Sequence, residues 1–329
     1  MDQIPIARAV REYAALEPRL RRGASEAIGL LTKILDEVGI NYLSVTGRAK
    51  ALASFAAKAS REEDGAREFS DPINQIGDLI GVRVITYVRS DVAAVVAALG
   101  DELTILDDRD LGEETASEGR FGYASRHLQV RLPDTVAAAH PNIGDRQVQV
   151  QIRTVLQHAW AEFEHDIRYK GSVPEEHRSE FNRRFILAAG LLELADVEFS
   201  TIRDRLREGV GEVDAHEDDD PRITTAELSA FLAGQYADAG WSRTDHYEWM
   251  AGLVLELGIT SLSELAEVTR AVDIDAINTA MAYRHPTGAV RRLDDALLKT
   301  YAERYIGLRG NEHRVELLQA RLAKFNTAR

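Results

Sequence analysis

Basic residues cluster in one short segment of an otherwise acidic chain. Arg48, Lys50, Lys58 and Arg61 fall within fourteen positions, although the 329 residues carry a formal charge of −14 at pH 7. A cluster of this kind can form a local pocket for an anionic ligand. General affinity for nucleic acid is not expected, because neutralising a phosphate backbone needs a broad basic surface.

Two charged residues mark the start of a β-rich run. Asp78 precedes this run, VRVITYV at 82–88, and Arg83 lies inside it. A guanidinium in a buried strand needs an acidic partner or an anionic ligand. Asp78 taken alone is also explained as a turn or cap residue between a helix and a strand.

The segment FGYASRH at 121–127 places three polar or aromatic side chains on one face of an expected strand. Period-two alternation brings Tyr123, Ser125 and His127 to that face. An aromatic ring, a hydroxyl and an imidazole in this arrangement could contact a nucleotide.

A second alternating segment, QVQVQIR at 147–153, presents three amides and one guanidinium on a common face. These side chains are Gln147, Gln149, Gln151 and Arg153. A solvated sheet face is the alternative explanation of the same pattern.

His158, Glu162 and His165 stand at i, i+4 and i+7 on the helix that is expected to follow. This spacing would permit metal ligation, but no further local ligand completes a zinc site. His165 and Asp166 also resemble the dyad of metal phosphohydrolases, without the upstream His and distant Asp that such a site requires.

The hydrophobic pattern predicts an alternation of helices and strands up to residue 208. Residues 5–38 are expected to form two helices, which Pro18 and Gly23 separate. The basic cluster is expected on an Ala-rich helix at 47–61. A short helix should open at Asp71-Pro72 and end near Gly81, and Ser90 or Asp91 should cap the next helix, which Gly100 should end. Strands are expected at 41–46, 82–88, 103–106, 125–131 and 146–152, the last two as an antiparallel pair, and long helices at 154–170 and 179–208.

The acidic stretch GEVDAHEDDDP at 211–221 is interpreted as a linker. An all-helical region is expected at 222–329. The chain contains no cysteine, so a disulfide, a thiolate metal site and a Cys nucleophile are all excluded. The N-terminal segment does not have the pattern of a signal peptide, no run could span a bilayer, and a cytoplasmic location is expected.

Four separated motifs occur in the order and spacing of the RelA/SpoT synthetase domain. They are R-x-K-x(3)-S-x(3)-K-x(2)-R at 48–61, D-L-I-G-V-R-V at 78–84, G-Y-x-S-x-H at 122–127, and Q-x-Q-I-R-T at 149–154 with the W-A-x-x-E-H that follows. The resemblance covers about residues 40–171 and is closest to the small stand-alone alarmone synthetases. It implies an α+β fold, with a mixed β-sheet flanked by helices, in a nucleotidyltransferase-like domain at 1–210.

The resemblance also implies a reaction, the transfer of the β,γ-pyrophosphate of ATP to the ribose 3′-hydroxyl of GDP or GTP. Asp78 would hold Mg²⁺, and Arg83 would lie beside the donor nucleotide. The residues that would hold the donor triphosphate are Arg48, Lys50, Ser54, Lys58 and Arg61. Tyr123 would stack on the acceptor guanine, and the remaining acceptor contacts would come from Ser125, His127, Gln151, Arg153 and His158. Related stand-alone enzymes often self-associate, so a homo-oligomer is expected.

Two positions depart from the family pattern. Gln149 stands where the family usually has a catalytic Glu, and a neutral amide cannot accept a proton at physiological pH. The usual Lys before the Gly-Tyr turn is not aligned, although Arg120 could supply its charge. Two alternatives to the synthetase therefore stay open: a nucleotide-binding regulator that has lost catalysis, and a toxin-type synthetase that acts on adenine nucleotides or on the 3′ end of tRNA.

Overall fold

The computed structural model describes most of the chain in two compact units. The described residues are 4–63, 65–112, 114, 125–170, 177–208, 222–283 and 287–327, without the side chains of 168–170, 178 and 206–208. The first unit comprises Met1–Leu35 and Tyr42–Ser200, and the second comprises Asp36–Asn41 and Thr201–Arg329. The predicted linker at 211–221 lies outside the described residues, so the predicted domain limits at 210 and 222 stay a prediction.

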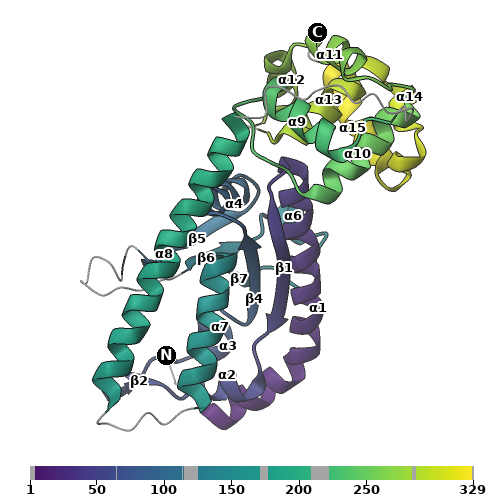
Figure 1. The fold of residues 1–329 in the computed structure, drawn as a ribbon. Coiled ribbons are helices and arrows are strands. Elements are labelled where there is room, and N and C mark those ends of the chain that lie inside the picture. Colours follow the sequence, from purple (N-terminus) through teal and green to yellow (C-terminus); the bar gives the residue numbers. More distant parts are fainter. Residues whose placement is uncertain are drawn as a thin grey trace. The chain divides into compact units, whose positions relative to one another are not determined.

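A five-stranded mixed sheet forms the centre of the first unit (Figure 1). Its order is β1-β4-β7-β6-β5, in which β4 and β7 run parallel and the other neighbours run antiparallel. The strands are β1 (Tyr42–Ala49), β4 (Ile80–Thr86), β5 (Thr104–Asp110), β6 (Arg126–Arg131) and β7 (Gln147–Thr154). The predicted fold class, a mixed sheet flanked by helices, is confirmed, and so is the antiparallel pair that the alternation at 125–131 and 146–152 predicted.

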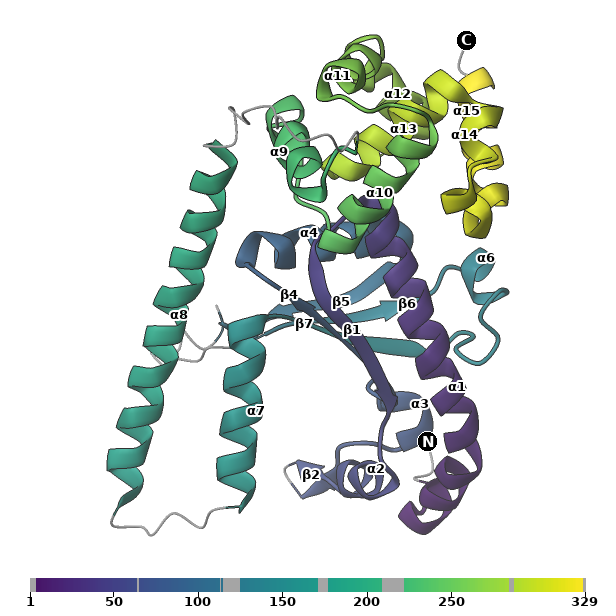
Figure 2. The same ribbon diagram turned by 45° about the vertical axis from the view of Figure 1, so that its right-hand side comes forward.

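The sheet has one apolar and one polar face because apolar and polar residues alternate along its central strands. On β7 the buried residues Val148, Val150 and Ile152 alternate with partly exposed polar ones. Figure 2 shows α1 (Ile6–Val38) and α7 (Val155–Lys170) on opposite sides of the sheet. The apolar side chains of the sheet therefore belong to the core, whereas the polar ones on the other face stay partly exposed.

Helix α1 is a single continuous helix, so the predicted break at Pro18 and Gly23 is wrong. A proline inside a helix removes one backbone hydrogen bond, but packing along a 33-residue helix outweighs that loss. Gly23 permits a close approach instead of ending the helix. A Cβ atom there would lie 2.9 Å from both Ile80 Cδ1 and the Asn142 carbonyl oxygen.

The predicted helix at 47–61 is also shorter than expected. Arg48 lies at the end of β1, where it pairs with Gly81 of β4, and Lys50 follows the strand. Helix α2 begins only at Leu52 and ends at Ala59. Pairing with the neighbouring strand thus overrides the helix propensity of this Ala-rich segment.

The other elements are short helices, a hairpin, one helix of intermediate length and one long helix that extends into the second unit. Helix α3 is Pro72–Gln75, so the chain from Ile76 to Asp78 is a turn, not the predicted helix. Helix α4 begins at Arg89 without a side-chain cap and passes through Gly100, so both predicted caps and the predicted stop are wrong. The remaining elements are β2 (Glu62–Glu63), β3 (Ala66–Arg67), α4 (Arg89–Glu102), α6 (Asp134–Ala137) and α8 (Arg178–Glu208).

The described part of the second unit is helical, as the sequence predicted. Its elements are α9 (Thr225–Gln235), α10 (Thr244–Glu256), α11 (Leu262–Arg270), α12 (Ile274–Met281), α13 (Ala289–Tyr301), α14 (Glu303–Ile306), η2 (Arg309–Arg314) and α15 (Val315–Thr327). They enclose a core of large apolar side chains that includes Leu232, Met250, Leu293 and Leu318. Across the described chain, no helix combines the length and the apolar character needed to cross a membrane.

A buried ionic cluster lies among the helices of the second unit. Asp294 accepts hydrogen bonds from Arg314 (Nη1, 2.9 Å) and Arg321 (Nη1, 2.8 Å), with Arg291 Nη1 at 3.3 Å. Burial alone would raise the pKa of the Asp294 carboxyl, but the surrounding guanidinium groups hold it well below its ordinary value. This carboxylate is therefore ionised, and Asp295, which pairs with Arg321, adds a second buried carboxylate beside the three arginines.

Candidate functional site

The polar face of the sheet is built by register across four strands. Gln149 on β7 pairs with Gly81 on β4 and with Gln129 on β6, and Gln151 pairs with Arg83 and His127 in the next polar row. Because paired residues point to the same side of a sheet, these side chains form one continuous polar surface. Strand β1 extends both rows, since Arg48 pairs with Gly81 and Thr46 with Arg83.

A cavity of about 310 Å³ opens on this polar face at the start of α2. Ser54 contributes from α2 and Asp78 from the turn before β4, while the other lining residues come from β1, β4, β7 and the link to α2. The lining residues are Thr46, Gly47, Arg48, Ala49, Lys50, Ala51, Ser54, Asp78, Gly81, Val82, Arg83, Gln149 and Gln151. Among them Asp78 is the only carboxylate, while three carry a positive charge.

Asp78 is held between two ammonium groups. Lys50 Nζ lies 2.6 Å from Asp78 Oδ2, and Lys58 Nζ lies 3.2 Å from Asp78 Oδ1. Burial alone would raise the pKa of Asp78, but the hydrogen bonds and charges of the two lysines hold it below its ordinary value. The turn itself is fixed from β6, where Gln129 Nε2 donates to the Gly77 carbonyl oxygen at 2.7 Å.

The donor set around Asp78 fits a single-carboxylate Mg²⁺ site that a phosphate ligand completes. Mg²⁺ is usually bound by one or two carboxylates together with substrate phosphates. Lys50 and Lys58 occupy both carboxylate oxygens of Asp78, and a triphosphate would draw these ammonium groups toward itself. Within the described part of the chain, no group of three or more His, Cys, Asp or Glu residues is placed to hold a metal by protein ligands alone.

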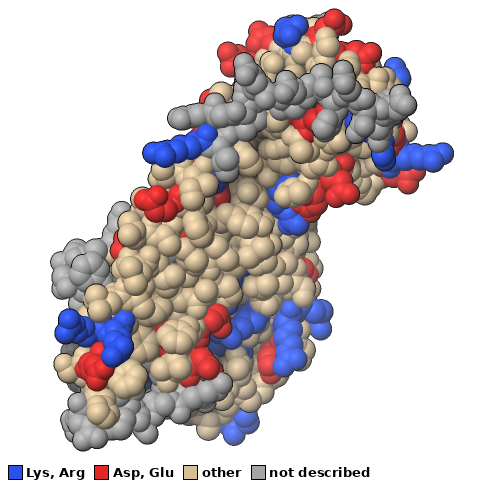
Figure 3. All heavy atoms as spheres, viewed as in Figure 1, with Lys and Arg blue, Asp and Glu red and all other residues tan. Residues whose placement is uncertain are grey.

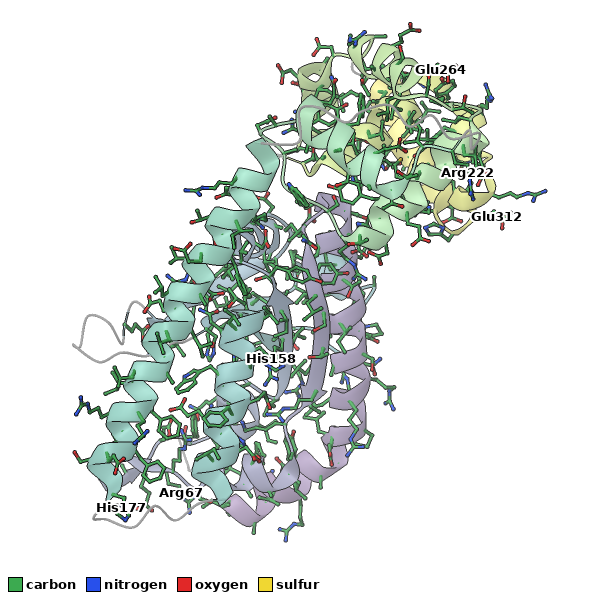
Figure 4. All side chains as sticks on the ribbon, viewed as in Figure 1. Arg67, His158, His177, Arg222, Glu264 and Glu312 are labelled. Carbon is green, nitrogen blue, oxygen red and sulfur yellow. The ribbon has the colours of Figure 1, made fainter. Side chains whose placement is uncertain are left out.

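Arg83 connects the cavity to α7. Its Nη1 atom lies 2.9 Å from Glu162 Oε1, and His158 Nδ1 lies 3.7 Å from the same oxygen. Figure 4 shows His158 on α7. The spacing of His158 and Glu162, which suggested metal ligands in the sequence, thus places both side chains beside a guanidinium of the cavity.

The predicted acceptor residues extend the polar face beyond the cavity. Ser125 Oγ lies 2.8 Å from His127 Nε2. Burial, and next the positive charges of Arg153 and Arg109, lower the pKa of His127 to about 4, so this imidazole is neutral at physiological pH. Its chemistry is then that of a hydrogen-bonding group.

Two buried nitrogen atoms near α7 have no hydrogen-bond partner among the described residues. They are Arg153 Nε and His158 Nδ1. Burial lowers the pKa of both side chains, and the neighbouring charge of Arg83 lowers them further. A buried donor without a partner costs free energy, so these two positions fit contacts to a bound ligand.

Most of the sequence-predicted residues come together at this site. Seven of them line the cavity, namely Arg48, Lys50, Ser54, Asp78, Arg83, Gln149 and Gln151. Lys58 reaches Asp78 from α2, whereas Arg61 is exposed beyond the end of that helix. Tyr123 and Arg120 lie outside the described residues. The roles assigned to all these residues stay predictions.

Sequence reasoning missed several neighbours of the site. Thr46 alternates with Arg48 along β1, but the helix expected from residue 47 hid that relation. The pairing of Lys50 with Asp78 and of Arg83 with Glu162 joins residues 28 and 79 positions apart, and no local pattern indicates either contact.

Comparison with known proteins finds one matching family and several similar proteins. Residues 47–173 match the family described as a region found in RelA / SpoT proteins. GTP pyrophosphokinase YjbM of Bacillus subtilis (strain 168) is 32% identical over 168 residues, which are 50% of this chain and 73% of that protein. GTP pyrophosphokinase YwaC of the same organism is 30% identical over 135 residues, 39% of this chain and 60% of that protein. The crystal structure of the small alarmone synthetase 1 from Bacillus subtilis aligns with a TM-score of 0.48 and 28% identity, covering 60% of this chain and 99% of that one.

Proposed function

This chain belongs to the RelA/SpoT-type family of stand-alone synthetases, and from that premise we propose that it transfers the β,γ-pyrophosphate group of ATP to the ribose 3′-hydroxyl of GDP or GTP. The observation that carries the proposal is the cavity on the polar sheet face, which Arg48, Lys50 and Arg83 line together with Asp78. A cytoplasmic location belongs to the proposal, since both nucleotides are available there.

The charge of the cavity suits a triphosphate donor. Arg48, Lys50, Lys58 and Arg83 supply four positive charges, and Asp78 supplies one negative charge. Glu162, which pairs with Arg83, supplies a second negative charge, and the remaining excess of two can bind a polyanion through charge-assisted hydrogen bonds. Lys50 and Lys58 are already side by side at Asp78, so they are placed to contact neighbouring phosphate groups. Arg83 would lie against the donor nucleotide.

In the proposed reaction the acceptor 3′-oxygen attacks the β-phosphorus of ATP. The bond between that phosphorus and the oxygen bridging to the α-phosphorus breaks, and AMP leaves with the bridging oxygen. Positive groups stabilise the charge that moves onto the bridging oxygen in the transition state. Lys50 and Lys58 would perform this role, and Ser54 would add a hydroxyl donor.

Mg²⁺ belongs to the same proposal, with Asp78 as its protein ligand. When bound, it would neutralise phosphate oxygens and orient the donor. Two ammonium groups occupy the Asp78 carboxylate. A bound triphosphate would draw them toward itself and leave the carboxylate free for the metal, so donor binding and metal binding would reinforce each other.

The acceptor would lie along the polar face toward β6 and α7. Ser125, His127 and Gln151 provide hydroxyl, imidazole and amide groups there. Arg153 and His158 provide the two buried nitrogen atoms that have no described partner. Such groups suit the edges of a nucleoside, and Tyr123 would stack on its base.

A second candidate function is nucleotide binding with little or no transfer. The observation that favours it is Gln149, because the proton of the 3′-hydroxyl needs an acceptor and an amide cannot take it. Asp78, the one carboxylate among the described lining residues, is already bound by two lysines and its pKa is lowered. Asp78 is therefore a poor base.

Product analysis distinguishes the two candidates. The protein is incubated with ATP, Mg²⁺ and either GDP or GTP, and the nucleotides are separated by anion exchange. Transfer predicts AMP and a guanosine nucleotide with two additional phosphates, in equal amounts. Absence of both products across several divalent metals and pH values, with nucleotide binding intact, would retire the enzymatic proposal and leave the binding function.

We further propose that the protein is a homo-oligomer that assembles through α8. Large apolar side chains are exposed on this helix and on adjacent α7. They are Phe163, Ile167, Phe181, Ile186, Leu187, Leu191, Leu194, Val197 and Phe199. Figure 3 shows a broad area over α8 and α7 with few charged atoms. A contiguous apolar surface of this kind usually marks an interaction site.

The charge pattern of α8 suggests a second copy as the occupant. An antiparallel pair of α8 helices, centred near Leu191, places Leu187 of one copy opposite Leu194 of the other. The same register places Arg183 opposite Glu198. The surface is therefore self-complementary in both apolar and charged residues, as an interface with two-fold symmetry requires.

Light scattering coupled to size exclusion tests this assembly. Leu191, which is 68% exposed, is changed to Glu, and Leu106 of β5, which is 40% exposed, is changed to Glu as the control. Leu191→Glu should dissociate the oligomer, whereas the control Leu106→Glu should not. Arg183→Glu should weaken the oligomer, and adding Glu198→Arg should restore it. A wild-type monomer at micromolar concentration would contradict the proposal.

A further inference from the structure

Tyr13 connects the N-terminal helix α1 to the donor cavity. Its side chain is fully buried, and its hydroxyl donates a hydrogen bond to the main-chain carbonyl oxygen of Lys50. Tyr13 lies outside the residues that match the family, 47–173, so the family pattern assigns it no role. Because α1 packs on the sheet, the contact joins a rigid element to the segment between β1 and α2.

The ring of Tyr13 supports α2 as well. It stacks on Phe55 with ring centroids 4.1 Å apart and an interplanar angle of 10°. Phe55 is fully buried and anchors α2, the helix that carries Lys58. One residue of α1 thus touches both supports of the cationic site, namely the backbone of Lys50 and the helix of Lys58.

Lys50 is fixed at three points around Asp78. Its backbone nitrogen donates to the Leu79 carbonyl oxygen at 2.9 Å, its carbonyl oxygen accepts from Tyr13, and its Nζ atom lies 2.6 Å from Asp78 Oδ2. Rigid support by neighbouring groups is what holds functional side chains in productive geometry. Two of these contacts come from Asp78 and the adjacent Leu79, whereas the third comes from Tyr13 on α1.

The Tyr13 hydroxyl stays a donor throughout the neutral pH range. Burial, and next the negative charges of Glu17 and Asp78, raise its pKa to about 12. The hydroxyl therefore keeps the proton that it donates to Lys50 at neutral pH.

We infer that Tyr13 is a positioning residue of the donor site, which holds Lys50 and α2 so that both lysines meet the donor phosphates. This inference rests on the proposed function of the cavity. The competing explanation is that Tyr13 only fills the core between α1 and α2. The two differ in one respect: a positioning residue affects donor binding selectively, whereas a core residue affects the stability of the whole unit.

The test compares two conservative variants by calorimetric binding. Tyr13→Phe removes the hydroxyl and keeps the ring, and Tyr42→Phe is the same substitution at another buried tyrosine of the first unit, at the opposite end of β1 from Arg48. The dissociation constants for α,β-methylene ATP with Mg²⁺ and for GDP are measured separately. Because one hydrogen bond contributes about 0.5–1.5 kcal/mol, Tyr13→Phe should weaken donor binding by roughly 2- to 12-fold. GDP binding should not change, and Tyr42→Phe should change neither.

A double-mutant cycle with Lys50→Met separates positioning from packing. If Tyr13 acts through Lys50, Tyr13→Phe should have little further effect on donor binding once Lys50 is Met. Equal losses in both backgrounds, or an unchanged donor constant in folded Tyr13→Phe, would overturn the inference. If Tyr13→Phe does not fold, Phe55→Leu is used instead, because it removes the aromatic ring on which Tyr13 stacks. This variant should again weaken the binding of the donor analogue alone, and equal losses for the donor analogue and GDP would refute the inference. Wild-type protein that binds no donor analogue would instead refute the proposed function.

Discussion

Replacing Gln149 by Glu should turn a weak or inactive transferase into an efficient one. The side chain lies on β7 among the residues that line the cavity, opposite Gly81 of β4. Gln and Glu have nearly the same shape, so the substitution changes charge and proton affinity without a steric cost. The new carboxylate could accept the proton of the acceptor 3′-hydroxyl, which the amide cannot.

The size of the effect follows from the role of the added group. A positioned general base contributes about 10²- to 10⁴-fold in rate, which corresponds to roughly 3–5 kcal/mol of activation free energy. Donor binding should suffer far less. Three cations line the cavity and Lys58 reaches Asp78, while Asp78 and Glu162 supply two negative charges, so the formal charge of this group falls only from two to one. The increase is therefore expected in kcat, with a smaller change in the KM for ATP.

The assay measures initial rates of product formation for wild type, Gln149→Glu and Gln147→Glu. Gln147 shares the polar face of β7 but does not line the cavity, so Gln147→Glu adds the same charge to the same strand outside the cavity lining. Only Gln149→Glu should accelerate transfer. A fast wild-type enzyme that gains nothing from Gln149→Glu, or an equal gain from Gln147→Glu, would rule out a missing general base at position 149.

Three further outcomes concern stability. The pKa of His127, lowered to about 4, means that the unfolded chain binds a proton between about pH 6.5 and 4 that the folded chain does not. The free energy of unfolding should therefore decrease as the pH is lowered from about 6.5 to 4. His127→Gln should make this decrease smaller, as measured by urea unfolding at each pH. Gly288→Ala places a Cβ atom 2.7 Å from the Gly39 carbonyl oxygen, so it should lower the free energy of unfolding by about 1–3 kcal/mol, measured by thermal unfolding. Gly252→Ala is the control, because its Cβ atom would meet no atom within 4 Å, and it should not destabilise the protein. Asp294→Asn removes the buried carboxylate that three arginines share and leaves Asp295, beside Arg321, as their negative partner; it should lower the free energy of unfolding by roughly 3–5 kcal/mol, measured by chemical unfolding.

Local sequence patterns predicted the central strands well because those strands are buried on one face. The alternation in QVQVQI fixes which side chains of β7 point to the core, and the structure has that register. The same reasoning placed Gln149, Gln151 and Arg153 on a common polar face. Residues that share a strand face could therefore be grouped before their neighbours were known.

Propensity alone misled where tertiary contacts dominate. The Ala-rich segment at 47–61 favours helix, yet Arg48 lies in β1 because pairing with β4 satisfies its backbone. Pro18 and Gly23 predicted a break, but α1 continues along the sheet, and Gly23 serves a close approach to Ile80. Contacts between distant segments, such as Tyr13 with Lys50, have no local signal in the sequence.

A crystal structure with α,β-methylene ATP, Mg²⁺ and GDP would test the proposed donor site directly. Triphosphate oxygens are expected within hydrogen-bonding distance of Lys50 and Lys58, with Asp78 on the metal and the guanine nucleotide toward His127. A triphosphate bound elsewhere, with both lysines still paired to Asp78, would contradict this expectation.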